Sequence, residues 1–194
     1  MDRRFKVAAP VAAALICLAA VALAGIPDCT LSTIPNVVAC PDGSMPTLFT
    51  IVSTSGPING ATVELRYSVA ADTAACWCTG QTHPNISGIT NASGQVTFYI
   101  HGGGCLNPAT IPGGTAIEVY VNSIACKAIG QVSPDVISSR TPPCQVTLAD
   151  AVNFTVPLSS SIYGFCYDLN SDLAVGLTDA VLFTPPAASG ATCP

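Results

Sequence analysis

The stretch PINGATVELRYS at residues 57–68 carries the clearest strand signal in the chain. After its Asn-Gly pair, polar and apolar side chains alternate through β-branched and aromatic residues, which is typical of a strand with one buried face. Similar segments occur at residues 47–53, 95–102 and 116–123, and Gly and Pro punctuate the chain between them. No apolar stripe with a 3.6-residue period interrupts this region. Several short strands at this spacing predict a mostly β fold, an antiparallel β-sandwich over residues 25–132.

Residues 57–68, together with GITNASGQVTFYI at 88–100, resemble the bacterial Ig-like domains of surface proteins. Those domains repeat a P-x-x-G-A-T-V strand and a T-(D/N)-x-x-G-x-(V/A)-T-F strand. The resemblance covers roughly 45 residues and rests on turn glycines and alternation. It implies an Ig-like sandwich and says nothing about chemistry, because functions belong to sites and not to folds.

Residues 1–24 are typical of a secretory signal peptide. Three basic residues precede an apolar run over residues 7–24, and the run ends in the small residues of an A-x-A cleavage site. We expect cleavage before Gly25, which leaves a secreted or surface-held chain with no membrane insertion. The alternative is an uncleaved anchor, since the run has about the ~18 residues of a short membrane span.

Removal of that segment leaves an acidic chain with few charges. Three basic residues, Arg66, Lys127 and Arg140, stand against ten acidic ones, a formal net charge of −7. Such a chain lacks the basic surface that nucleic acids require and is repelled by anionic lipid. Charged residues make up 9% of the whole sequence, against about 25% in ordinary domains. We expect this neutral surface to be covered by an assembly or by attached groups.

Cysteines are frequent. The chain has ten, of which nine follow residue 24. In a secreted chain they predict disulfides rather than metal ligands or a redox pair. The odd number leaves one thiol free, capped or bonded to another molecule. Cys76 and Cys78 are too close in the chain for a relaxed bridge to each other, so each is expected to pair elsewhere. The disulfide candidates are Cys29, Cys40, Cys76, Cys78, Cys105, Cys126, Cys144, Cys166 and Cys193.

A repeat follows residue 133. VTLADAVNFTVP at residues 146–157 and VGLTDAVLFTPP at 175–186 align at an offset of 29 residues, with eight of twelve positions identical. Each copy has an Asp two residues after a Leu, and then apolar residues spaced for one face of a short helix. We predict two short helices that pack against each other and have Asp150 and Asp179 as their N-caps.

Oxygen-bearing side chains precede the second copy at regular positions. Counted from Asp168 as position 1, Asn170 is at position 3, Asp172 at position 5 and Asp179 at position 12. Ala174 at position 7 needs to offer only its backbone carbonyl. This is the spacing of the EF-hand loop, in which calcium takes 6 to 8 oxygen ligands. We predict one calcium ion at these five residues; a plain N-cap role for Asp179 is the alternative.

Two departures from that loop bear on calcium binding. Leu173 stands at position 6, where glycine usually makes the sharp turn, and a positive φ costs leucine on the order of 1 kcal/mol. The first copy has lost its loop, because the offset places Ser139, Thr141 and Pro143 at positions 1, 3 and 5. Asp135 is a candidate remnant of position 1. We therefore predict one calcium ion and not two.

Residues 133–194 resemble a dockerin domain through their duplicated loop–helix units, the Asp at position 12 and Val175 at position 8. The resemblance implies a small α-helical calcium module that binds a cohesin-type partner. Many dockerins recognise cohesin through polar residues at positions 10 and 11. Here these are Leu-Thr at 177–178 and Leu-Ala at 148–149, half of them apolar. The helices could instead dock on the protein's own Ig-like domain.

No catalytic set stands out in the sequence. HGGG at 101–104 resembles the oxyanion-hole motif of esterases, but the chain lacks the G-x-S-x-G elbow that this motif serves. A glycine-rich turn is the simpler interpretation. His83 and His101 have no neighbours at zinc-site spacing, and the acidic residues before the loop are scattered singly. We predict that the protein is not an enzyme.

Three N-x-[ST] sequons make Asn85, Asn91 and Asn153 candidates for glycosylation. With the low charge and the odd cysteine count, these features predict a secreted structural protein that assembles with its own copies into a fibre or layer. The segment at 25–40 could add a strand to a neighbouring subunit, or it could form the first strand of its own domain. The alternative function is an adaptor that docks on a cohesin-type partner.

Overall fold

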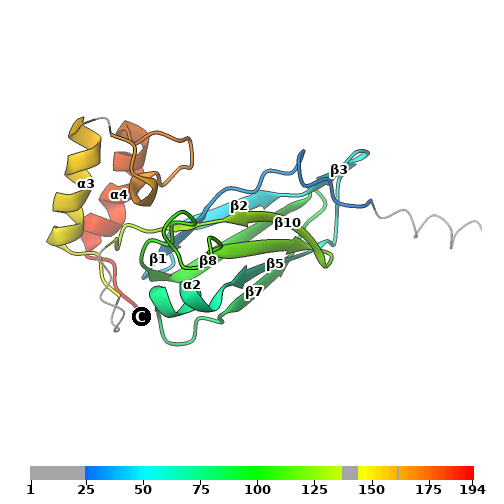
Figure 1. Ribbon diagram of the computed structural model, residues 1–194, viewed down its shortest axis with the longest axis horizontal. Coiled ribbons are helices and arrows are strands. Elements are labelled where there is room, and N and C mark those ends of the chain that lie inside the picture. The colour runs from blue at the N-terminus through cyan, green and yellow to red at the C-terminus, as the bar shows by residue number, and fades with distance from the viewer. Residues whose placement is uncertain (1–24, 137–143, 161) are drawn as a thin grey trace, which may run out of the picture.

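The computed structural model describes residues 25–136, 144–160 and 162–194. The fold is mostly β, with several sheets and two helices near the C-terminus (Figure 1). The predicted signal peptide lies outside the described residues. Among the residues that are described, no helix is long and apolar enough to cross a membrane. We call residues 25–136 the β region and residues 144–194 the helical region.

The first sheet has the strand order β11-β1-β8-β2, with β6 also paired to β8. Its strands are β1 (Val37–Cys40), β2 (Pro46–Thr50), β6 (Cys76–Trp77), β8 (Gln95–Gly103) and β11 (Gln131–Val132). β2 and β6 run antiparallel to β8, but β1 pairs in parallel with both β8 and β11. The antiparallel prediction is therefore wrong for β1. All four side chains of β1 are buried, as expected of a parallel strand that is covered on both faces.

The second sheet is antiparallel and has the order β10-β9-β5-β7. Its strands are β5 (Thr62–Tyr67), β7 (Asn85–Ile89), β9 (Ile117–Val121) and β10 (Ile124–Ile129). Alternate side chains of β5 are buried, which confirms the alternation in the opening stretch. A small ribbon joins β3 (Val52–Ser53) to β4 (Gly56–Pro57). The short helix α2 (Val69–Ala74), which the sequence did not predict, begins at the capping hydroxyl of Ser68.

The larger core contains buried side chains from both sheets. Phe49 and Ile100 of the first sheet belong to the same cluster as Val63, Leu65 and Val119 of the second. The chain before β1 also stays in this region, since Thr33 pairs with Thr50. The segment at 25–40 thus supplies the first strand of its own sheet.

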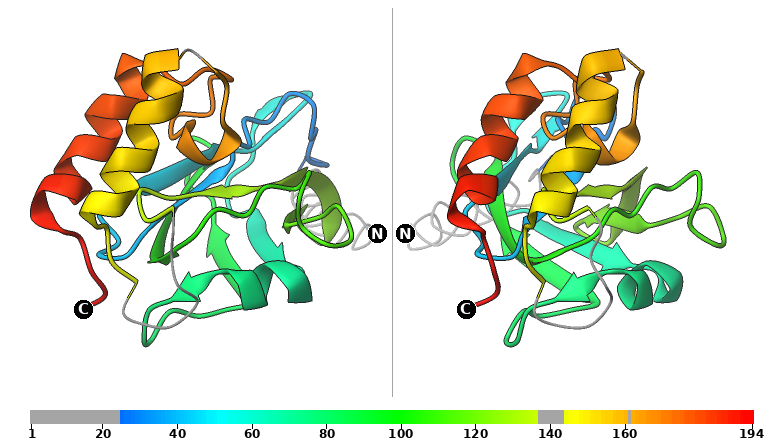
Figure 2. Two further views of the ribbon diagram at one scale, coloured as in Figure 1. Left: turned by 60° about the vertical axis from the view of Figure 1, so that its left-hand side comes forward. Right: turned by 90° about the vertical axis from the view of Figure 1, so that its left-hand side faces the viewer.

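The helical region contains α3 (Leu148–Ser160), the 3-10 turn η1 (Phe165–Tyr167) and α4 (Leu177–Ser189). The two α-helices begin and end 29 residues apart, which is the offset of the repeat. They lie side by side and antiparallel (Figures 1 and 2). Phe154 and Phe183, which are equivalent in the two copies, stack with ring centroids 4.6 Å apart. The repeat therefore forms the pair of packed helices that the sequence predicted.

The helical region shares its core with the β region. Val38, Met45 and Val132 of the β region cluster with Phe154 and Phe183 of the two helices. The helices thus dock on the protein's own β region, one of the alternatives drawn from the sequence.

Disulfides fasten the two regions together. Cys29–Cys126 lies within the β region, whereas the others cross between regions: Cys76–Cys144, Cys78–Cys193 and Cys105–Cys166. Cys76 and Cys78 pair elsewhere, as predicted. Among the described residues the free cysteine is Cys40, which is fully buried, and burial raises the pKa of its thiol to about 12. These bridges indicate an oxidising, extracellular environment.

Candidate metal centre

The predicted calcium loop connects η1 to α4. Asp168 directly follows η1, and Asp179 lies in the first turn of α4. Their side chains are buried although the loop between them is largely exposed, with Asp168 1% and Asp179 0% exposed. The Cys105–Cys166 disulfide fixes the chain two residues before Asp168. One end of the loop is therefore tied to the β region and the other to a helix.

Asp168 holds the loop backbone around its carboxylate. Its Oδ1 accepts the N–H of Asp172 at 3.0 Å, and its Oδ2 accepts the N–H of Leu173 at 3.0 Å. The Tyr163 hydroxyl donates to the same Oδ2 at 3.3 Å. Burial raises the pKa of Asp168, the two N–H groups oppose this, and the charges of Asp179 and Asp172 raise it further. The carboxylates thus repel one another, and a cation would relieve that repulsion.

Asp179 closes the loop from the helix side. Its Oδ1 accepts the N–H groups of Leu169 at 2.8 Å and Asn170 at 3.2 Å. Its Oδ2 accepts the N–H of Gly176 at 2.9 Å, and Gly176 is the N-cap residue of α4. The prediction that Asp179 is itself the N-cap is therefore wrong by three residues. Asp179 caps from the third helical position, because its side chain reaches back to the backbone of the true cap.

The middle of the loop turns through two left-handed residues, Ser171 with φ 58° and Leu173 with φ 67°. Asn170 Oδ1 accepts the N–H of Asp172 at 3.0 Å, and Asn170 Nδ2 donates to Asp172 Oδ2 at 2.8 Å. Asp172 Oδ1 accepts the N–H of Ala174 at 2.9 Å. Leu173 takes the positive φ that position 6 demands, although a leucine side chain disfavours it.

The donor set fits calcium, which prefers oxygen ligands from a tightly wound backbone. A carboxylate offers about four lone-pair sites, so the oxygens that accept N–H groups keep capacity for an ion. Asp168, Asp172 and Asp179 do not form a group whose oxygens all lie within 4.8 Å of one another among the described residues. Some closure is needed before one ion contacts all three, and the exposed Asp172 has the most freedom to move.

In the described residues of the first repeat, the helix-capping part of this arrangement is present. Asp150 is buried, and its Oδ2 accepts both the N–H of Thr147 at 2.8 Å and its hydroxyl at 2.7 Å. Thr147 precedes the helix as Gly176 does in the second repeat, so Asp150 too caps from the third helical position and is not the N-cap. The predicted equivalents Ser139, Thr141 and Pro143 lie outside the described residues.

Asp135, the candidate remnant of position 1, is buried and lies close enough to Asp150 to feel its charge. Its Oδ2 has no hydrogen-bond partner among the described residues. A β-carbon on Gly103 would lie 2.2 Å from this oxygen, so only glycine fits there. Burial, and then the charge of Asp150, raise the pKa of Asp135 to about 7. The hydrogen bond from the N–H of Gln145 acts in the opposite direction and lowers this pKa. Its place in the repeat could be predicted from the sequence, but its burial could not.

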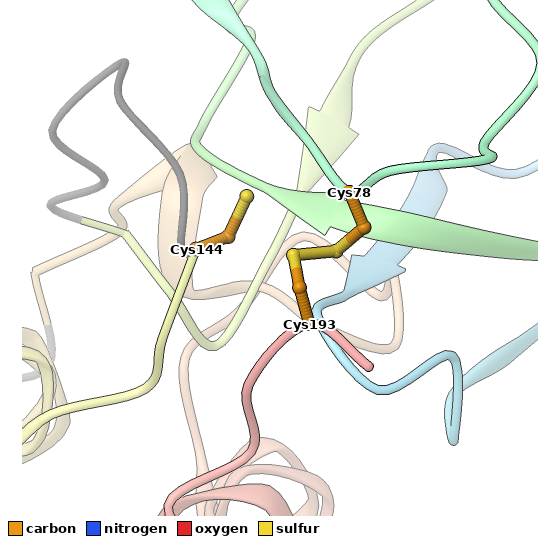
Figure 3. A group of neighbouring side chains, drawn as sticks. All are labelled: Cys78, Cys144 and Cys193. Carbon is orange, nitrogen blue, oxygen red and sulfur yellow. A yellow bond between two sulfur atoms is a disulfide. The ribbon is translucent and has the colours of Figure 1, made fainter.

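Sulfur atoms also gather at the junction of the two regions. The sulfurs of Cys78, Cys144 and Cys193 lie within 4.8 Å of one another (Figure 3). Cys78 is bonded to Cys193 and Cys144 to Cys76, so these sulfurs are not thiolates that could bind a metal. They belong to two adjacent disulfides that link the β region to the helical region.

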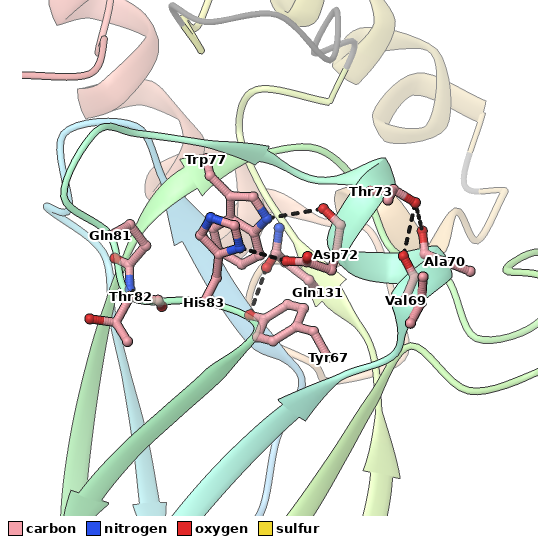
Figure 4. Close-up of polar contacts among 10 residues, drawn as sticks. All are labelled: Tyr67, Val69, Ala70, Asp72, Thr73, Trp77, Gln81, Thr82, His83 and Gln131. Carbon is pink, nitrogen blue, oxygen red and sulfur yellow. Dashed lines mark hydrogen bonds and ion pairs between the residues drawn. The ribbon is translucent and has the colours of Figure 1, made fainter.

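The histidine with a carboxylate partner has a structural role. His83 Nδ1 lies 2.8 Å from Asp72 Oδ1, and the imidazole stacks on Trp77 with centroids 4.9 Å apart (Figure 4). Trp77 Nε1 donates to the Asp72 carbonyl at 3.0 Å, which ties α2 to β6. Tyr67 completes the group edge-on to Trp77. HGGG at 101–104 lies at the end of β8, where Gly102 and Gly103 allow β6 and Asp135 to approach.

The three sequons differ in surroundings. Asn85 is exposed on β7. Asn91 is exposed, and its Oδ1 accepts the N–H groups of Ser93 and Gln95. Asn153 is half-buried on α3, and its Nδ2, the atom that a glycan would modify, donates to the Ala149 carbonyl at 2.8 Å. Asn85 and Asn91 are therefore more accessible than Asn153.

Comparison with protein-family models, with curated proteins and with solved structures yields no match to this chain.

Proposed function

We propose that this protein is a non-catalytic, secreted structural protein of a cell surface or extracellular matrix. In this proposal an Ig-like sandwich carries a dockerin-like module that one calcium ion stabilises, and copies of the chain assemble into a fibre or layer. The observation that carries the proposal is the oxygen-rich loop at 168–179. Its two buried carboxylates bind the surrounding backbone inside a region that shares its core with the β region.

The bound ion would supply positive charge among three mutually repelling carboxylates. Asp168 and Asp179 orient the backbone at the two ends of the loop, and Asp172 and Asn170 lie on its exposed side. Because the loop is continuous with α4, ordering the loop also stabilises the helix and its contacts with the β region. The proposed role of calcium is therefore structural.

The calcium proposal is tested by melting the oxidised chain from residue 25 with about 10–100 mM calcium and with a chelator. Extracellular calcium modules bind with Kd of ~10⁻⁴ to 10⁻³ M. A hundredfold excess of calcium over Kd should raise the free energy of unfolding by about 2.7 kcal/mol. Asp168→Ala should abolish this shift. Asp28→Ala is a matched control, because Asp28 accepts N–H groups of Thr30 and Leu31 in a similar turn of the β region. If wild type and Asp168→Ala respond alike to calcium, the metal site is refuted.

Self-assembly is supported by the low charge and by exposed apolar side chains on both helices. The free cysteine no longer supports it, because Cys40 is buried and cannot link copies. Sedimentation of the oxidised protein at tens of micromolar tests the proposal, which requires particles larger than a monomer. A compact monomer would instead favour the adaptor function.

A further inference from the structure

The outward face of α3 is an apolar ridge. Leu148, Val152 and Val156 are spaced four residues apart, and their exposed fractions are 80%, 57% and 61%. This spacing places them on one side of the helix, opposite the buried Phe154. We call these three residues the α3 ridge.

The outward face of α4 repeats the pattern but lies in different surroundings. Leu177, Val181 and Pro185, at the offset of 29, are also exposed. Beside them is a groove of about 320 Å³ between α4 and the turn that joins β1 to β2. A second hollow of about 410 Å³ continues it toward the start of α4, and Val181 and Leu182 line both. We define the α4 groove by Leu177, Val181, Leu182 and Pro185 on one side and Met45 and Pro46 on the other.

Charge restricts what can cover these faces. The charged residues of α3 and α4 are Asp150 and Asp179, and both are buried. Among the described residues of the helical region, Asp172 is the one exposed charged residue. The chain after residue 24 carries a net charge of −7, and apart from Asp172 its acidic residues that are not buried lie in the β region, so two copies repel each other where those residues face one another. The exposed faces of α3 and α4 carry no charged side chain, so copies can meet there without that repulsion.

We propose that the α3 ridge of one copy packs into the α4 groove of the next. This inference rests on the proposed self-assembly and names its surface. A row of three apolar side chains matches an apolar groove that runs along a helix of the same length, and the same chain supplies both. Because ridge and groove lie on different helices, the contact joins two different surfaces. Such contacts repeat from copy to copy and build an open chain unless the rotation happens to close a ring.

Two matched variants test the inference. Val152→Glu places a charge on the ridge, and Val181→Glu places it at the equivalent position in the groove. Each should raise the concentration needed for assembly at least about tenfold, because a charge would be buried without a partner. Val69→Glu on α2, where the native side chain is 83% exposed, is the control and should assemble as wild type does. Thermal melts confirm that each variant is folded, and Leu148→Glu with Leu177→Glu repeats the pair one turn earlier.

Mixing the two variants distinguishes this contact from others. Val152→Glu keeps an intact groove and Val181→Glu keeps an intact ridge, so an equimolar mixture should form heterodimers and stop there. Sedimentation equilibrium reports the mass. Loss of assembly without rescue on mixing would refute the ridge-in-groove contact, as would binding of a monomeric wild type to neutral lipid vesicles through these residues. Unchanged assembly of both variants refutes this surface but leaves self-assembly standing, whereas a wild type that stays monomeric refutes both.

Discussion

Asp150 and Asp179 occupy the same position in two helices that start 29 residues apart, and both are buried. Each accepts the backbone N–H of the residue that precedes its helix. The second repeat adds Asp168, Asn170 and Asp172 before the helix, whereas the first offers Asp135 alone among its described residues. The aspartate at position 12 therefore caps the helix in both repeats, whether or not a metal binds. The residues that distinguish a calcium loop from a capped helix are those at positions 1, 3 and 5.

The stacked phenylalanines should matter equally in the two repeats, whatever the metal does. Phe154→Ala and Phe183→Ala should each lower the free energy of unfolding by about 3–5 kcal/mol, the cost of a cavity left by a buried ring. Urea titration with calcium and with chelator measures this. The two losses should agree within about 1 kcal/mol in both conditions, given the usual scatter of such sites. A loss confined to Phe183 would show that the first repeat is not an equal partner in the core.

Asp135 should make stability depend on pH, because it is buried and its pKa is higher in the folded chain than in the unfolded chain. Its pKa of about 7 in the folded state is above the unfolded value, so the folded state keeps a proton that the unfolded state has lost. The stabilisation is therefore complete below about pH 4 and is lost as pH rises to about 7.

One unit of pKa difference corresponds to about 1.4 kcal/mol, so raising the pH from 5 to 8 should lower the free energy of unfolding by about 2–3 kcal/mol. Asp135→Asn should remove most of this dependence in chelator. If the variant shows the wild-type pH profile, Asp135 is not the group that titrates.

Alanine substitution of the two capping aspartates should show that only the second repeat responds to calcium. Asp150→Ala should cost about 1–2 kcal/mol with calcium and with chelator alike, because it leaves the N–H and hydroxyl of Thr147 without their acceptor at the start of the helix. Asp179→Ala should cost a similar amount in chelator and more in calcium, since it also removes a ligand. Melting curves of both variants in the two buffers give the comparison. Calcium-dependent loss at Asp150 would mean that the first repeat also binds an ion.

Local patterns in the sequence were sufficient for the parts of the fold that depend on neighbouring residues. Alternation in residues 61–69 predicted β5, and the twelve-residue repeat predicted α3 and α4. The N-cap of α4 was misplaced because Gly176 has no capping side chain to mark the helix start, and that of α3 was misplaced although Thr147 is a residue that commonly caps helices. The aspartate three residues later, in the position of the capping-box acid, was the available signal.

Contacts between distant residues could not be predicted in this way. The disulfides that join the two regions span 61, 68 and 115 residues, and β1 pairs in parallel with strands far along the chain. Nothing local to Cys76 or Val37 specifies these partners. For the site, position and residue type predicted the oxygen donors of the loop, but the burial of Asp168 and Asp179 depends on how the helical region docks.

Leu173 offers the smallest and most specific way to sharpen the comparison. Its φ of 67° is a conformation that glycine adopts freely and leucine does not, and its side chain is 77% exposed. Leu173→Gly should therefore lose almost no packing. It should stabilise the folded chain by up to about 1 kcal/mol, because backbone strain is relieved. The greater conformational freedom of glycine in the unfolded chain offsets part of this gain.

If the strain is present only when the loop is closed around the ion, Leu173→Gly should raise the free energy of unfolding more in calcium than in chelator. Its calcium affinity should then rise by up to about fivefold, which corresponds to about 1 kcal/mol. Titration calorimetry measures the affinity, and Leu173→Ala, which keeps a β-carbon, is the control and should show no gain. A glycine variant that binds calcium no better than wild type would show that this turn is already formed without the ion.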